Sequence, residues 1–177
     1  MNYSILSSKE KKTLILTGTS NYTNEKLAEI VQKYNVNSLV FDYYHNEYID
    51  SIPNSIKKLV LGKCFNKPID NLPIGLEELQ INYKFNQSLD FLPSSLKILT
   101  IKDFPPEEIS NFQQGLDNLP NNLKELYLPY LSYSLKRFNN LPKNLEKIKI
   151  GSDYKYIQEL LNIHGEKVVE IYANRFY

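Results

Sequence analysis

The stretch that decides the fold is Leu92-Pro93-Ser94-Ser95-Leu96-Lys97-Ile98-Leu99-Thr100-Ile101, because closely similar stretches recur along the chain. Each copy has an aliphatic residue before a proline and another three residues after it. Two more aliphatic residues follow, at intervals of three and two. Successive prolines are 20, 20, 27 and 22 residues apart, a period typical of proteins built from stacked repeats. The five prolines are Pro53, Pro73, Pro93, Pro120 and Pro142.

Each unit ends in the pattern Leu-x-x-Leu-x-Leu, which is the strand signature of a leucine-rich repeat. A sixth unit lacks the proline: Leu39 and Phe41 lie 20 residues before Leu59 and Leu61. About 15 residues separate successive strands, which is enough for parallel pairing but short for a helical crossover. The sequence therefore predicts an α/β leucine-rich-repeat-like solenoid. It would have one curved parallel sheet of about eight strands and an irregular or 3₁₀ outer side.

The residues that flank the repeats are expected to cap the solenoid, because no repeat can bury its end face alone. At the N-terminal end, Thr13–Thr17 has a strand pattern. Thr23 is suited to cap a helix that would bury Leu27, Ile30 and Val31 on one face.

At the C-terminal end, Ser152 or Asp153 could cap a second helix, and Gly165 could end it. Val168–Tyr172 then has the pattern of a last strand. Residues 1–177 are thus predicted to form one domain: a strand–helix cap over 1–37, six repeats of about 20–27 residues over 38–150, and a helix–strand cap over 151–177.

A second pattern recurs between the strands, where an aromatic residue and an amide are followed by an aliphatic residue and an aspartate. Phe65-Asn66, Phe85-Asn86 and Phe112-Gln113 begin three of these copies, and His45-Asn46 begins the first. Together, the two patterns closely resemble the FNIP repeat family, a leucine-rich-repeat subclass found in social amoebae and in large DNA viruses of amoebae. The resemblance covers about residues 38–150 and implies a protein-interaction module. Members often carry an F-box, but the residues before these repeats match a strand and a helix instead.

Structural roles are expected for the residues of this second pattern. Phe65, Phe85 and Phe112 would stack as a spine in the core. Asn66 and Asn86 would be buried and would satisfy backbone groups of the loops. The aspartates before each Leu-Pro pair would cap turns rather than bind a metal, since they would form a ladder without convergent ligands.

Composition and motifs argue against several function classes. The net charge is +1, from 21 basic and 20 acidic residues, which does not favour nucleic acid or an anionic membrane as a partner. The single cysteine, Cys64, cannot form an internal disulfide, so we expect the cytoplasm, or the host cytoplasm for a viral protein. No phosphate-binding loop, metal motif or catalytic triad is present in the sequence, so neither a cofactor nor an enzymatic activity is expected.

If the strand leucines point inward, the residues between them face a partner on the concave side. The candidate anchors are Tyr83, Tyr127 and Tyr130, since tyrosine is enriched in interface cores. An alternative is that A/T-rich codons account for the many tyrosines. The expected function is non-catalytic protein–protein interaction. The alternative function is a self-assembling structural component that forms a homodimer through an edge strand or the concave face. The other candidate contact residues are Ile98, Thr100, Glu78 and Glu125.

Overall fold

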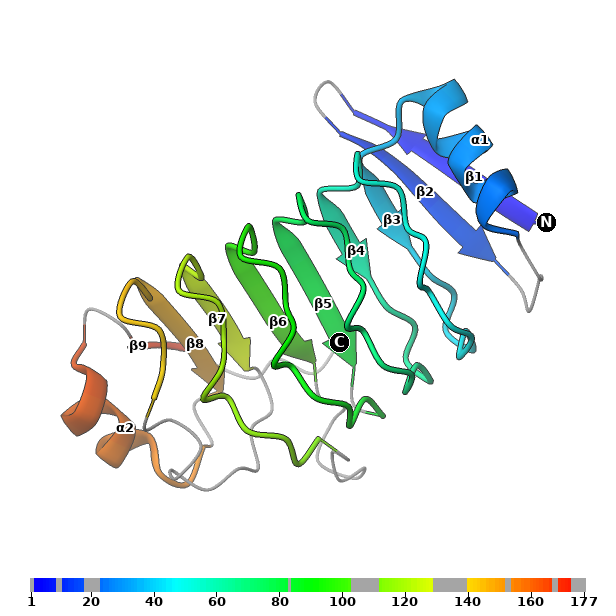
Figure 1. The fold of residues 1–177 in the computed structure, drawn as a ribbon. Coiled ribbons are helices and arrows are strands. Elements are labelled where there is room, and N and C mark those ends of the chain that lie inside the picture. The colour runs from blue at the N-terminus through cyan, green and yellow to red at the C-terminus, as the bar shows by residue number, and fades with distance from the viewer. Residues whose placement is uncertain are drawn as a thin grey trace.

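The computed structural model describes residues 2–8, 11–17, 23–82, 84–102, 112–128, 140–151, 154–166 and 169–172. These residues form a single nine-stranded sheet in which every strand pairs with the next one in sequence (Figure 1). Strands β2 to β9 are parallel and β1 is antiparallel to β2, so the predicted sheet of about eight parallel strands is confirmed. The strands are β1 (Asn2–Ser7), β2 (Lys12–Thr17), β3 (Ser38–Val40), β4 (Lys58–Val60), β5 (Glu78–Asn82), β6 (Ile98–Lys102), β7 (Glu125–Leu128), β8 (Lys147–Gly151) and β9 (Val169–Tyr172).

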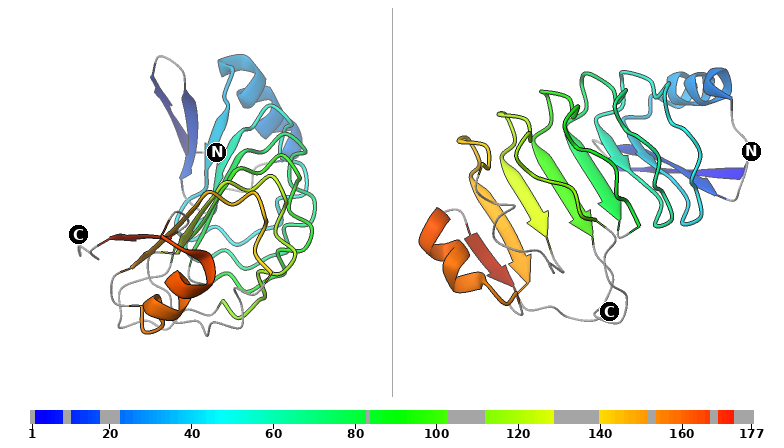
Figure 2. Two further views of the ribbon diagram at one scale, coloured as in Figure 1. Left: turned by 90° about the vertical axis from the view of Figure 1, so that its left-hand side faces the viewer. Right: turned by 60° about the horizontal axis from the view of Figure 1, so that its bottom comes forward.

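The repeats wind as a solenoid with strands along one side and loops along the other (Figure 2). The proline of each repeat begins a turn just before the strand. In all five copies, the N–H three residues after the proline donates to the proline carbonyl at 3.0 Å. Proline suits this position because its φ is already fixed and no sheet hydrogen bond is required of its nitrogen. From β3 to β8, the described connections on the outer side are therefore loops and turns.

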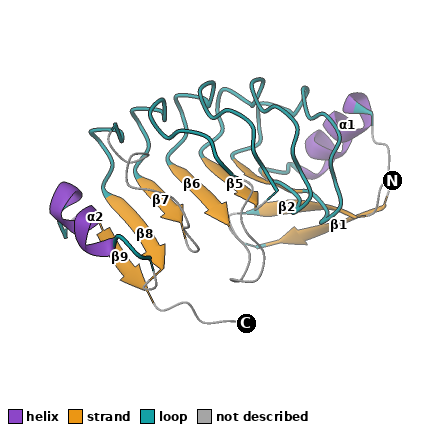
Figure 3. Ribbon diagram, turned by 90° about the horizontal axis from the view of Figure 1, so that it is seen from below, coloured by secondary structure: helices purple, strands orange, loops and turns teal. Residues whose placement is uncertain are grey.

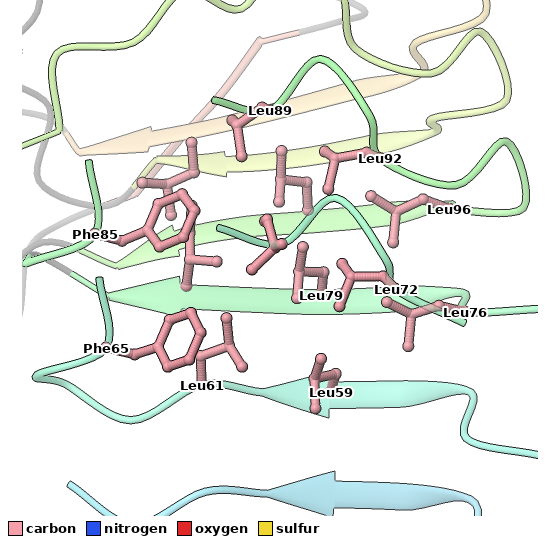
Figure 4. Packing of buried hydrophobic residues seen from close by; sticks show 14 of the residues in the cluster. Leu59, Leu61, Phe65, Leu72, Leu76, Leu79, Phe85, Leu89, Leu92 and Leu96 are labelled. Atoms are coloured by element: carbon pink, nitrogen blue, oxygen red, sulfur yellow. The ribbon is translucent and has the colours of Figure 1, made fainter. Parts of the chain in front are cut away.

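The core lies between the sheet and the outer loops (Figure 4). The strand leucines Leu59, Leu79 and Leu99 are buried, and so are four of the five aliphatic residues before the prolines, such as Leu72 and Leu92. These side chains belong to one continuous hydrophobic cluster that extends from the first strands of the parallel sheet to the last. Because each repeat contributes the same few side chains, its burial depends on the repeats above and below it.

The predicted phenylalanine spine is present in the core. Phe65 stacks on Phe85 and Phe85 on Phe112, with ring centroids 6.3 Å apart in each pair. His45 takes the aromatic position of the first repeat and lies 4.4 Å from the Phe41 ring and 6.0 Å from the Phe65 ring. Burial lowers the pKa of His45 and so favours its neutral imidazole.

The repeated asparagines form a ladder, but they are less buried than the sequence suggested. Asn66 is exposed and Asn86 half-buried. The side-chain oxygen of each accepts a hydrogen bond from the backbone N–H of the corresponding residue in the next repeat. The distances are 2.8 Å from Asn86 to Asn66 and 2.8 Å from Gln113 to Asn86. Solvent reaches these asparagines because the ladder runs along the outer loops. There, each side-chain oxygen requires only a backbone N–H of the next repeat as its donor.

Two of the repeated aspartates also link neighbouring repeats. Asp90 accepts a hydrogen bond from the Asn118 side chain at 2.8 Å, and Asp117 accepts one from the Asn140 side chain at 3.1 Å. These bonds to the next repeat differ from the predicted capping of the aspartate's own turn. The hydrogen bonds from Asn118 and Ser88 lower the pKa of Asp90.

The N-terminal cap is a β-hairpin with a helix, rather than the single strand and helix predicted. Strand β1, which the sequence analysis did not predict, pairs with β2 over all six of its residues. Helix α1 (Asn24–Tyr34) follows, and the Thr23 side chain accepts a hydrogen bond from the Lys26 N–H, as predicted. The helix buries Leu27, Ile30 and Val31, so its predicted inward face is confirmed.

The C-terminal cap consists of helix α2 (Ile157–His164) and strand β9. Gly165 ends the helix as predicted, and its N–H donates to the Leu161 carbonyl at 2.7 Å. The predicted start was wrong: the N-cap is Tyr156, with no side-chain hydrogen bond. Ser152 and Asp153 lie outside the described residues.

Candidate partner-binding surface

The sheet presents one face to the core and the other away from it, and we call the second one the concave face. Figure 3 shows the sheet on the side opposite the loops, with both of its ends curving toward this face. Parallel pairing without register slips aligns its side chains into two rows. The first row is Ser38, Lys58, Glu78, Ile98, Glu125 and Lys147; the second is Val40, Val60, Gln80, Thr100, Tyr127 and Lys149.

Side chains in the two rows are half-buried, except for Ser38, which is buried. The candidates Glu78, Ile98, Thr100 and Glu125 are therefore on one continuous surface. Tyr127 lies beside Thr100 on the next strand. The structure thus brings these five residues together, while Tyr83 and Tyr130 lie outside the described residues.

The N-terminal half of this face carries a cluster of charges around Glu78. The Lys58 ammonium lies 2.7 Å from a Glu78 carboxylate oxygen. The Lys11 ammonium is 3.7 Å from the same oxygen, although Lys11 precedes β2 and Glu78 begins β5. The contact is possible because the sheet curves, which brings side chains of non-adjacent strands together. The repeat pattern does not point to Lys11, because this residue precedes the first repeat.

The C-terminal half of the face is organised around Tyr127. Its hydroxyl donates a hydrogen bond to the carboxylate of Glu125, which is two residues earlier on the same strand. The Lys149 ammonium, on β8, lies 4.9 Å from the centre of the Tyr127 ring, within the range of a cation–π contact. These contacts fix the ring and leave it half-buried, so Tyr127 would meet a partner as a preorganised aromatic group.

The face also has apolar surface, which comes from aliphatic side chains that point away from the core. Val40 and Val60 lie side by side in the second row, and Ile98 separates Glu78 from Glu125 in the first. All three are half-buried. The face therefore alternates charged groups with small apolar areas, an arrangement found in protein–protein interfaces.

A second aromatic group, which the sequence analysis did not select, is exposed just after β3. Tyr43, Tyr44 and Tyr48 are all exposed, and the rings of Tyr43 and Tyr44 are 4.7 Å apart. Lysines of the next repeat lie over two of these rings: Lys63 at 4.9 Å from Tyr43 and Lys67 at 5.1 Å from Tyr48. Three tyrosines within six residues are the sequence signal that could have identified this patch.

Other kinds of site have less support. Within the described ranges, no group of three or more histidine, cysteine or acidic side chains could hold a metal ion. A pocket lies at the Leu-Pro turns of the last two repeats, away from the concave face, and includes Leu119, Pro142 and Lys143. No helix in the described part of the chain is both long and apolar enough to cross a membrane.

The comparison with known protein families agrees with this repeat architecture. The FNIP Repeat family matches residues 34–64, 65–104 and 111–153. No curated protein matches the chain. One similar solved structure is that of CroV588, described as a novel circular LRR protein, with 22% sequence identity and a TM-score of 0.48. The similarity covers 86% of this chain and 29% of that protein, so the chain spans less than a third of its length. Because the three matched segments cover more than half of its residues, the chain belongs to the FNIP repeat family.

Proposed function

We propose that this chain is a non-catalytic protein-interaction module that binds a protein partner on the concave face. The observation that carries the proposal is the alignment of half-buried polar, charged and apolar side chains in two unbroken rows over β3 to β8. The FNIP repeat family has a repeat architecture suited to such a scaffold role. We expect the protein to act in the cytoplasm.

The chemistry of the face favours a partner with both charged and apolar groups. Lys58 and Glu78 already neutralise one another, so a partner gains less from a single charge than from side chains that complement both members of the pair. Ile98 lies between the two glutamates, at the centre of the first row, where an apolar partner residue could be shielded from water. We therefore assign Ile98 and Tyr127 as the central contacts.

The test compares substitutions at two isoleucines. Ile98→Asp places a charge at the centre of the concave face, whereas Ile74→Asp does so in a Leu-Pro turn, where Ile74 is 80% exposed. Both variants are first compared with the wild type by circular dichroism and thermal unfolding. Affinity enrichment from amoebal lysate, followed by mass spectrometry, then identifies proteins captured by each bait.

A partner held by the wild type and by the Ile74→Asp variant, but lost with Ile98→Asp, would support the proposal. Titration with that purified partner should show at least about a tenfold loss of affinity, as for a residue central to an interface. If both variants retain the partner equally, it binds elsewhere and the concave-face assignment is wrong.

A further inference from the structure

Strand β1 lies at the N-terminal edge of the sheet and, among the strands that the structure describes, has a neighbour on one side only, β2. The pairing with β2 is regular: its six registered pairs run from Asn2 opposite Thr17 to Ser7 opposite Lys12, without a bulge. A regular edge strand offers its outer backbone groups to another strand. The outer edge of β1 is therefore a surface on which a further strand can add.

The sequence of β1 lacks the features by which proteins usually protect such an edge. Asn2-Tyr3-Ser4-Ile5-Leu6-Ser7 contains no charged residue and no proline. Five of its six side chains are exposed, and Leu6 is 59% exposed. By contrast, β9 at the other end of the sheet carries a charged residue, Glu170.

The apolar side chains on the core-facing side of β1 are partly exposed at the edge of the sheet. Tyr3 and Ile5 lie opposite Leu16 and Leu14, and so share the side of the sheet that faces the core. Ile5 packs against the core, and the Tyr3 hydroxyl is hydrogen-bonded to Tyr34 of helix α1. Tyr3 nevertheless remains 39% exposed, so the apolar layer under α1 ends at β1 without a cover.

We propose that β1 pairs antiparallel with β1 of a second copy of this chain, across a twofold axis. The strand is neutral, so two copies approach without repulsion between charges on the paired strands. If the axis is perpendicular to the sheet, opposed residues lie on the same face, and Tyr3 of one copy faces Ile5 or Ser7 of the other. Such pairing continues the apolar layer beneath both α1 helices and keeps the two concave faces on one side.

A twofold contact closes on itself, so it stops at a dimer. A contact of β1 with β9 of another copy would repeat head to tail and build a larger ring or an open filament. Pairing five residues of each strand gives an interface smaller than most stable dimers have, so we expect a weak, concentration-dependent association. The relevant measurement is therefore the mass of the protein over a wide concentration range.

Sedimentation velocity from about 5 to about 500 µM should show the mass rise from monomer to dimer. Leu6→Lys places a charge on the edge strand and should leave a monomer throughout. Ile163→Lys makes the same change at a residue of α2 that is 54% exposed, and should still dimerise. A wild type that stays monomeric at the highest concentration would overturn the proposal, and masses beyond a dimer would indicate head-to-tail stacking instead.

Crosslinking tests the pairing itself, in a Cys64→Ser background that removes the single native cysteine. Ser4 and Ser7 are both exposed residues of β1. In the proposed dimer, Ser4→Cys lies close to its equivalent across the axis. Ser7→Cys lies roughly 13 to 20 Å from its equivalent, from the rise per residue of a strand. A short bifunctional thiol reagent should link the first variant at least about tenfold faster; equal rates would reflect random collisions and reject this pairing.

Discussion

Replacing Phe85 by alanine tests whether the aromatic spine holds neighbouring repeats together. Phe85 is 1% exposed, and its ring stacks between those of Phe65 and Phe112 at 6.3 Å from each. Truncation of a buried phenylalanine typically costs about 3–5 kcal/mol. The two ring pairs contribute about 0.5–1.5 kcal/mol each beyond their buried area. We therefore expect Phe85→Ala to lower the free energy of unfolding by about 4 kcal/mol.

Two further variants separate the causes of this loss. Phe85→Leu keeps most of the apolar volume but removes both ring contacts, so it should cost about 1–3 kcal/mol. Phe91→Ala truncates a phenylalanine six residues later that is 67% exposed, and should change stability by less than about 0.5 kcal/mol.

The free energy of unfolding of all three variants is measured by urea titration. Circular dichroism and tyrosine fluorescence report the unfolding, because the chain has no tryptophan. The reasoning is refuted if Phe85→Ala costs no more than Phe91→Ala. If Phe85→Leu is as stable as the wild type, apolar volume alone explains the spine and ring stacking contributes nothing.

Three further predictions concern individual positions in the repeats. Burial lowers the pKa of His45, so below about pH 6.5 the unfolded chain takes up a proton more readily than the folded one, and the wild type should lose stability. His45→Phe should lose less stability when urea midpoints are compared at about pH 7.5 and about pH 5.5. A Cβ at Gly62 would lie 2.0 Å from the Asp42 carbonyl oxygen, so Gly62→Ala should lower the free energy of unfolding in urea by about 2 kcal/mol or more. Gly75→Ala is the control: its Cβ would meet only the end of the Lys57 side chain at 3.0 Å and a carbonyl oxygen at 3.5 Å, so it should be nearly neutral. Asn86→Ala removes the acceptor of the Gln113 N–H and should cost about 1 kcal/mol, with faster hydrogen exchange at that amide as the local readout.

Most of the solenoid could be predicted because its determinants repeat. The spacing of Leu59, Leu79 and Leu99 predicts both the strands and their register, and these residues do face each other across β4, β5 and β6. A shift of one residue would turn every leucine out of the core, so the register is strongly constrained. The phenylalanine spine could be predicted for the same reason.

Prediction was weaker where a feature occurs once. Strand β1 was missed because six residues with no repeat partner carry little signal, although Tyr3 and Ile5 do alternate with Asn2 and Ser4. The contact between Lys11 and Glu78 depends on the curvature of the whole sheet, which no local pattern encodes. The repeat pattern did not predict that Asn66 is exposed, because an asparagine ladder recurs with the same period whether its side chains are buried or exposed.

The arrangement of the repeat explains why the fold is easier to infer than the partner. Core positions recur as aliphatic residues, such as Leu59, Leu79 and Leu99, because each must fill the same space between the sheet and the loops. The residues immediately before them change freely, from Lys58 to Glu78 to Ile98, because their side chains leave the core and need not fill a fixed space. Substitution on the concave face is therefore compatible with an unchanged scaffold, and changes there alter what the surface can bind before they alter the fold. If the concave face binds a partner as proposed, the specificity for that partner is encoded in the positions that the repeat pattern leaves unconstrained.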